Sequence, residues 1–338
     1  NDNVQEDNAQ EDGVTIDMYE LSHPHDLLTR GFLVDVELMA SMLKNYGGKG
    51  IVKFIDLSKL RCETTTVVDG KLKEKIGDLR FSTKFKRGNH HSRIFLFFEH
   101  QSKKSKKFFL RTLEQIVQFY MMYDAAGGKY PFPVVVVLYS GQIPWNELLQ
   151  LRDFIDTPPG VDPNVLYFPV VLIDLTQIPR DRLKGHPAVV ALFDALQSSS
   201  FGDLNEGLPR IVGHIGEVKT DRRAAGWLSS LISYFLANPK VEKSDVAGAL
   251  SKILSEKEAN EMYNSVLAKN YLEGKAEGEI KAKADNVVKS LTIRFKKVPA
   301  SVSKSVNSFV DLVALDSLFE YAITCNSIEE FKKELSRR

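Results

Sequence analysis

The chain has 338 residues, of which 43% are hydrophobic and 26% charged, and its formal net charge is +1. This length is enough for two domains, the composition is that of an ordinary globular protein, and the near-neutral charge gives no overall indication of nucleic-acid binding. Two cysteines, Cys62 and Cys325, exclude a disulfide framework and a cysteine-type zinc site. The longest apolar run, residues 134–139, is far shorter than the roughly 20 residues of a membrane span, and no secretory signal is recognisable, so we expect a cytoplasmic protein without a membrane partner.

Residues 1–22 are expected to form a disordered acidic tail, because the first 20 residues contain seven acidic side chains and neither Lys nor Arg. Ordered structure is expected from about His25 and Asp26. Apolar residues at helical spacing then predict one or two amphipathic helices up to Gly47.

Strand signals dominate the next part of the chain. Residues 52–60 fit either a short strand or a helix, and the β-branched residues 64–68 predict a strand. From Leu79 apolar and polar residues alternate, as in a strand with one buried face. Residues 87–90 are turn-like and the apolar run 94–98 is typical of a buried strand, so a β-hairpin is expected here.

The register of this hairpin is expected to bring two carboxylates together. Folding about the turn pairs Arg80 with Phe97 and Asp78 with Glu99. Directly opposed residues have Cβ atoms roughly 5 Å apart and share a face of the sheet. Gln101 lies on that same face, two residues beyond Glu99.

Three oxygen-bearing side chains at one place suggest a cation site. The carboxylates of Asp78 and Glu99 would repel each other unless a cation lies between them. Oxygen ligands without nearby sulfur suit Mg²⁺ or a similar divalent ion. The alternative is that Asp78 is a solvated residue at a strand end and that Glu99 pairs with a lysine. Because Glu99 follows five apolar residues, we expect it at the margin of the core, which favours the cation site.

A strand–helix–strand unit is expected after the hairpin. A helix begins near Phe108 and ends near Gly127 and Gly128, and residues 133–139 are apolar throughout, as in a strand covered on both faces. A further strand is expected within residues 165–174, which would end the α/β core near residue 180.

The remainder of the chain is predicted to be helical. Apolar stripes indicate helices at 189–196, 223–236 and 246–254, and a long helix from about residue 257 towards Phe295. The expected domains are a tail at 1–22, an α/β domain at 23–180, a helical extension at 181–265, and a long helix with a small helical appendage at 266–338.

A basic segment lies beside the two expected carboxylates. Between residues 84 and 111 there are nine Lys or Arg residues, and Glu99 is the sole acidic residue in that window. Such a patch would attract a polyanion and raise its local concentration. The alternative for Lys103, Lys104 and the neighbouring lysines is a solvated turn after a strand.

Taken in order, the motifs of the first half resemble one known family. They are His25-Asp26 with Phe32-Leu33, Asp69, Gly77-Asp78-Leu79, Glu99-His100-Gln101-Ser102, Arg111, Tyr139-Ser140-Gly141 and Trp145. This order resembles the PD-(D/E)XK nuclease superfamily and, within it, the Rpn group of transposase-like recombination-promoting nucleases. The likeness covers about residues 23–146 and extends more weakly to about residue 200. Gly77 stands where the group usually has Ser, and Gln115 where it usually has Tyr.

The resemblance implies an α/β fold with a restriction-endonuclease-like core, in which helices flank a mixed sheet, followed by an all-helical C-terminal region. It implies a metal-dependent DNA endonuclease associated with transposition or recombination, and it leaves a homodimer open. Asp78, Glu99 and the backbone carbonyl of His100 would hold Mg²⁺, or Mn²⁺ or Ca²⁺ in its place, and Gln101 would orient the attacking water. The residues expected to contact DNA or its phosphates are Arg111, Lys103, Lys104, His25 and Gln115.

Three alternatives remain open at this point. His25 and Asp26 fit the capping of a helix start as well as a phosphate contact. The protein fits a degenerate nuclease that binds DNA or a partner without cutting it. It also fits a helical interaction protein in which the basic turn is incidental.

Overall fold

The computed structural model describes residues 24–63, 79–86, 93–104, 108–122, 130–145 and 168–337, without the side chains of residues 93, 99, 122, 271, 273 and 277. The expected acidic tail, the strand at 64–68 and the hairpin turn at 87–90 lie outside the described residues.

A five-stranded mixed sheet forms the centre of the first half. The strands are β1 (Arg61–Cys62), β2 (Leu79–Lys84), β3 (Arg93–Gln101), β4 (Phe132–Tyr139) and β5 (Val170–Asp174), and their order in the sheet is their order in the chain. The pairs β1–β2 and β2–β3 are antiparallel, whereas β3–β4 and β4–β5 are parallel. This arrangement confirms the expected α/β class with a mixed sheet.

The predicted hairpin register is confirmed over the described residues. Arg80 lies opposite Phe97, and the last described pair is Leu79 with Phe98. Asp78 lies outside the described residues. Strand β3 continues past the expected end at Glu99 as far as Gln101, because Glu99 to Gln101 pair with the end of β4.

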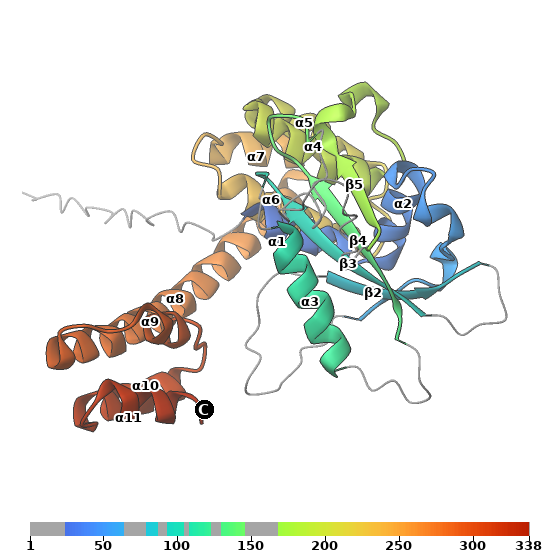
Figure 1. Cartoon of the computed structure of the whole chain (residues 1–338). Helices are drawn as coiled ribbons and strands as arrows, with labels where there is room; N and C mark the ends of the chain where they lie inside the picture. Colours follow the sequence, from blue (N-terminus) through green and yellow to red (C-terminus); the bar gives the residue numbers. More distant parts are fainter. Residues whose placement is uncertain are drawn as a thin grey trace, which may run out of the picture.

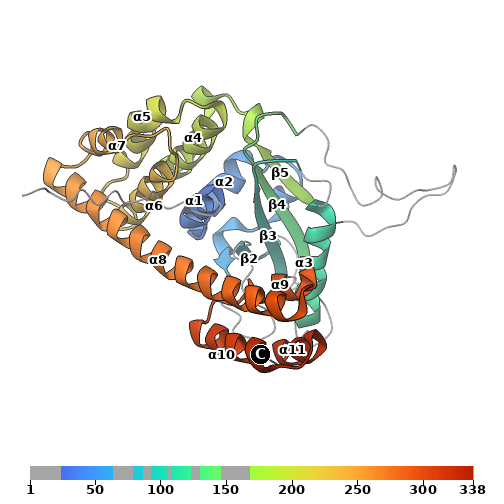
Figure 2. The same cartoon turned by 90° about the vertical axis from the view of Figure 1, so that its left-hand side faces the viewer.

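The two faces of the sheet are covered by different helices (Figure 2). On one face, Leu96 and Phe98 belong to the core shared with helices α1 (Pro24–Leu33), α2 (Val36–Tyr46) and α4 (Pro187–Phe201). On the other face, Phe95 and Phe97 belong to a second core with helix α3 (Phe108–Met122), the crossover between β3 and β4. Because both faces are covered, β4 is apolar on both sides, as its sequence predicts.

The structure defines two short segments more closely. Residues 52–60, for which a short strand or a helix was open, contain two 3₁₀ helices, Ile51–Phe54 and Leu57–Lys59. Of the strand expected within residues 165–174, Val170–Asp174 form β5, whereas Phe168 and Pro169 are not part of it and residues 165–167 lie outside the described residues. The start at Val170 fits Pro169, a residue without an N–H group for the ladder.

After β5 the described chain contains two short 3₁₀ helices and a series of α-helices, joined by loops (Figure 1). They are α4, α5 (Leu204–Gly216), α6 (Ala224–Leu236), α7 (Lys243–Leu250), α8 (Glu256–Phe295), α9 (Ala300–Val306), α10 (Leu312–Thr324) and α11 (Ile328–Leu335). None of the described helices is both long and apolar enough to cross a membrane.

The helical half contributes to two separate cores. One core is a single cluster of contacting buried residues, of which Leu28 is the first and Val266 the last in the chain. It joins the α/β part to helices α4 to α7 and the start of α8. The other lies at the far end of α8, where α9 and α10 pack on α8 and α11 packs on α9 and α10. Helix α8 connects the two as one long rod (Figures 1 and 2).

Candidate active site

Three of the expected active-site residues, Glu99, His100 and Gln101, are the last residues of β3, beside the carboxyl end of β4. Glu99 is paired through its backbone with Val137, and Gln101, which is partly buried, with Tyr139. Asp78 and the side chain of Glu99 lie outside the described part of the chain. The metal-ligand role of these two carboxylates therefore stays a prediction.

The side chain of His100 is directed to the opposite face of the sheet from Gln101, as strand alternation requires. Its Nδ1 lies 2.8 Å from Oδ1 of Asp26 in α1, and its Nε2 lies 2.8 Å from Oγ of Ser140 after β4. The ring is only 3% exposed. With both nitrogens engaged, the imidazole has no free position for a metal ion, so only the backbone carbonyl of His100 remains as a candidate ligand.

His25 lies beside His100, with their ring centroids 5.8 Å apart. The hydroxyl of Tyr234 in α6 is 3.0 Å from Nδ1 of His25. Burial, helped by the neighbouring His100, lowers the pKa of His25 to about 4. At neutral pH the ring is therefore uncharged, which removes the electrostatic reason for a phosphate contact, although the role itself stays a prediction. We call His25, Asp26, His100, Ser140 and Tyr234 the histidine cluster.

The remaining expected DNA contacts lie on the α3 side of the sheet and at the end of β3. Arg111 is the fourth residue of α3, and Gln115 follows one turn later on the same face, both partly buried. Lys103 and Lys104 are exposed just beyond Gln101. Their DNA-binding role stays a prediction.

The loop after β4 explains the Tyr-x-Gly and Trp signals of the sequence. The Tyr139 hydroxyl donates to the carbonyl of Ile143 at 2.8 Å, and a Cβ atom at Gly141 would collide with that hydroxyl. Trp145 packs edge-on against Tyr139, and its backbone N–H donates to Asp174 at the end of β5. These residues hold the carboxyl ends of β4 and β5 together.

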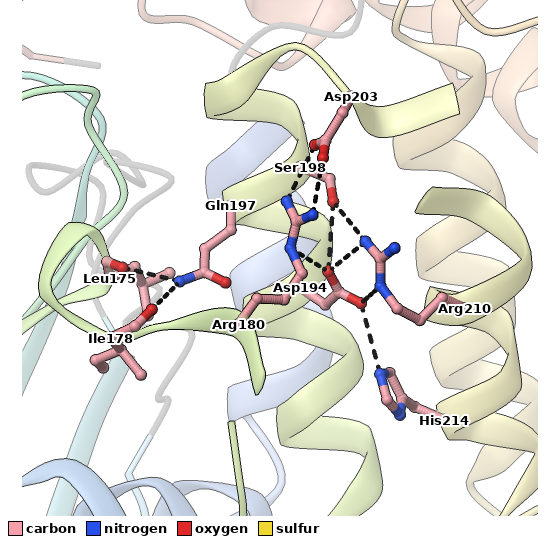
Figure 3. A network of polar contacts seen from close by, with 9 residues as sticks. All are labelled: Leu175, Ile178, Arg180, Asp194, Gln197, Ser198, Asp203, Arg210 and His214. Atoms are coloured by element: carbon pink, nitrogen blue, oxygen red, sulfur yellow. Dashed lines mark hydrogen bonds and ion pairs between the residues drawn. The ribbon is translucent and has the colours of Figure 1, made fainter. Parts of the chain in front are cut away.

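A second polar cluster was not expected from the sequence. Asp194 in α4 is fully buried, and its carboxylate contacts Arg180 at 3.2 Å, Arg210 at 2.7 Å and His214 at 3.5 Å (Figure 3). Arg180 also forms a two-pronged ion pair with Asp203. We call these five residues the Asp194 cluster. They join the 3₁₀ turn Arg180–Arg182 to α4 and α5.

The pKa values of this cluster follow from its charges. Burial alone would raise the pKa of Asp194, but hydrogen bonds from His214 and Arg210, together with both arginine charges, lower it to about 2. The hydrogen bond to Asp194 raises the pKa of His214 above its usual value. The one signal in the sequence was an acidic residue inside the apolar stripe of α4.

A cavity of about 400 Å³ opens beside the Arg180–Asp203 pair, with Gln197 and Phe201 among its lining residues. Its two charged lining groups are already paired with each other. The amide nitrogen of Gln197 donates to the carbonyl oxygens of Leu175 and Ile178. The cavity therefore offers a ligand no uncompensated charge.

The donor chemistry fits a hard cation, although the described part of the chain contains no group of three or more His, Cys, Asp or Glu residues that could hold a metal ion. The expected ligands are two carboxylates and a backbone carbonyl, all oxygen donors of the kind that Mg²⁺ prefers. The engaged ring of His100 is consistent with a donor set that contains no nitrogen.

Comparisons with known proteins agree with the family that the motifs resemble. A family model described as "Putative transposase, YhgA-like" matches residues 23–225. Recombination-promoting nuclease RpnD of Escherichia coli O157:H7 is 27% identical over 181 residues, which are 52% of this chain and 67% of the relative. Recombination-promoting nuclease RpnC of Escherichia coli strain K12 is 24% identical over 225 residues, which are 66% of this chain and 73% of the relative.

A further relative from strain K12 is named "Inactive recombination-promoting nuclease-like protein RpnE", and it is 25% identical over 179 residues, which are 52% of this chain and 58% of the relative. No solved structure matches the chain. Because the family model covers more than half of the sequence, the chain belongs to the YhgA-like putative transposase family, whose members include recombination-promoting nucleases.

Proposed function

We propose that this protein is a metal-dependent DNA endonuclease associated with recombination or transposition. The observation that carries the proposal is the antiparallel register of β2 and β3. It runs from Lys84 opposite Arg93 to Leu79 opposite Phe98, and one further step in the same register would pair Asp78 with Glu99. Family membership and the names of the relatives support nuclease activity at the level of the family.

The proposed core is of the PD-(D/E)XK type. Support comes from the hairpin β2–β3, which is followed by the crossover helix α3 and the parallel strand β4. In this arrangement position 99 alternates with His100 and shares the face of Gln101 and of α3. The basic residues Lys103 and Lys104 and the arginine of α3, Arg111, lie beyond the same end of β3.

The chemistry follows from these positions. Asp78, Glu99 and the carbonyl of His100 would hold Mg²⁺, or Mn²⁺ or Ca²⁺ in its place, and a bound ion lowers the pKa of a water ligand and neutralises charge on the scissile phosphate. Gln101 orients the water, but it has no titratable group and cannot act as a general base. Arg111 is suited to hold a phosphate with two hydrogen bonds, and Lys103 and Lys104 neutralise the adjacent backbone.

The proposal is tested by incubating supercoiled plasmid with the purified protein and Mg²⁺ or Mn²⁺. Nicking should occur with the wild type and should fall in Asp78→Asn and Glu99→Gln by more than the roughly 10–100-fold that changes next to a metal ligand cost. Asp316→Asn is the matched control, because Asp316 pairs with Lys283 in the far C-terminal core. Equal nicking by the wild type and both site variants would contradict the assignment.

A second function, DNA binding without cleavage, is favoured by one observation, the relative named as inactive. Retention of plasmid in a mobility-shift assay without nicking would support it. The salt dependence of binding would then give the number of phosphate contacts. The logarithm of the affinity falls linearly with the logarithm of the salt concentration, and each contact makes that slope more negative by about 0.9.

A further inference from the structure

Three segments that carry the motifs of the sequence meet at the side chain of His100. Asp26 belongs to the first turn of α1, His100 to the end of β3, and Ser140 follows the last residue of β4. Asp26 and His100 are 74 residues apart in the chain, and His100 and Ser140 are 40 residues apart. The side chain of His100 thus connects α1 to both parallel strands.

The partners of the ring hold it in one orientation. A carboxylate accepts hydrogen bonds, so Nδ1 of His100 is the donor in its contact with Asp26. The hydroxyl of Ser140 can either donate or accept, so it provides a partner for Nε2. Both ends of the imidazole are therefore held in place.

The backbone reinforces the same connection. The N–H of Ser140 donates to the carbonyl of Gln101 at 3.0 Å, which closes the ladder at the end of β3. The carbonyl of Ser140 in turn accepts from the hydroxyl of Ser200 in α4. Ser140, which is only 2% exposed, therefore holds the strand end both through His100 and through Gln101.

We propose that Asp26 and Ser140 are positioning residues that clamp the last residues of β3 through His100, and thereby orient Glu99 and Gln101 on the opposite face. The inference rests on the proposed function only where it concerns the metal. A strand cannot rotate about its axis at position 100 while the ring is held at both ends, so its neighbours at 99 and 101 keep their direction. Metal ligands and catalytic groups must be held within about 0.5 Å of their working positions, so the support of the end of β3 by Asp26 and Ser140 should affect metal binding.

The test uses Asp26→Ala, because the Asp26 side chain is 44% exposed and its loss leaves no buried cavity. Asp26→Asn is the conservative variant, which keeps an acceptor for Nδ1. Asp35→Ala is the matched control. Asp35 caps α2 and pairs with Arg223, so its loss destabilises the fold at the other end of α1, away from β3.

Two quantities are measured on the full chain: the amide hydrogen exchange of residues 100–102, and the affinity for Mn²⁺ by calorimetry. Asp26→Ala should speed exchange at the end of β3 relative to β5 and weaken Mn²⁺ binding about 10–100-fold. Asp26→Asn should recover most of both properties, and Asp35→Ala should change neither, although it lowers the melting temperature.

The possible outcomes test the positioning role of Asp26 and the proposed nuclease function separately. Unchanged exchange at residues 100–102 in Asp26→Ala would overturn the clamp, whatever the activity. Faster exchange together with unchanged Mn²⁺ affinity would also overturn it as a positioning device. Faster exchange in a protein whose wild type neither binds Mn²⁺ nor nicks DNA would support the clamp on the strand and overturn the proposed nuclease function.

Discussion

The histidine cluster and the Asp194 cluster place polar groups inside the protein in opposite ways. In the histidine cluster the ring of His100 is held between Asp26 and Ser140, and burial lowers the pKa of its neighbour His25 to about 4, which leaves His25 uncharged at neutral pH. In the Asp194 cluster a fully buried carboxylate faces two arginines, and the pKa of His214 is raised.

The difference teaches what each cluster can contribute. A buried carboxylate surrounded by cations holds its elements together through charge, and it becomes costly as soon as one member is lost. An uncharged ring such as that of His25 costs less to bury than an ion. The histidine cluster adjoins the end of β3, and the cluster built on a buried carboxylate lies between α4 and α5.

The largest effect is expected from Asp194→Asn. The change leaves Arg180 and Arg210 without their shared buried counter-charge, which should lower the free energy of unfolding by about 3–5 kcal/mol. Urea denaturation measures it. Asp203→Asn is the control, because the Asp203 side chain is 41% exposed and its loss should cost less than about 1 kcal/mol. Equal losses in the two variants would remove the distinction between buried and exposed partners.

A smaller effect is expected from His25 on acidification. Its pKa is lower in the folded protein than its ordinary value of 6.5, so the unfolded chain binds the proton more tightly. Stability should therefore fall as the pH drops from about 6.5 to about 4, by at most about 3 kcal/mol. His25→Gln should flatten this dependence when unfolding free energies are compared between pH 4 and 7. A variant with the same slope as the wild type would show that His25 is not buried in the neutral form.

The smallest effect is expected from His214, and it has the opposite sign. Its pKa is raised in the folded state, so its contribution is fully present below about pH 6.5 and is lost as the pH rises through the folded pKa. Because the side chain is 24% exposed, we expect less than about 1 kcal/mol. The stability difference between wild type and His214→Gln, followed from pH 6 to 9, should shrink with rising pH. A difference that stays constant with pH would mean that protonation of His214 contributes nothing to the stability of the fold.

The sequence was informative wherever local periodicity determines structure. The alternation from Leu79 and the apolar run to Phe98 predicted β2 and β3, and the turn-like residues 87–90 between them predicted their register. Helix α5 was not predicted, since Gly207, Pro209 and Gly213 weaken its helical signal. Its burial of Leu208 and Ile211 against the core outweighs that local preference.

The candidate site was only partly predictable for the same reason. Residue types and spacing identified the oxygen-rich end of β3 and the motifs around it. They did not reveal that Asp26 reaches His100, or that Asp194 joins Arg180 to Arg210, because such contacts depend on how distant helices pack.

The long helix α8 has a mechanical consequence. Between Val266, in the first core, and Ile280, which packs on the second, none of its described hydrophobic side chains belongs to either core. That interval is about 21 Å of helix, in which each residue adds 1.5 Å of length and about 100° of rotation. The direction in which the terminal bundle faces therefore follows the phase of this helix: one residue more or fewer would rotate the bundle by more than a quarter turn and leave the residues of both cores unchanged.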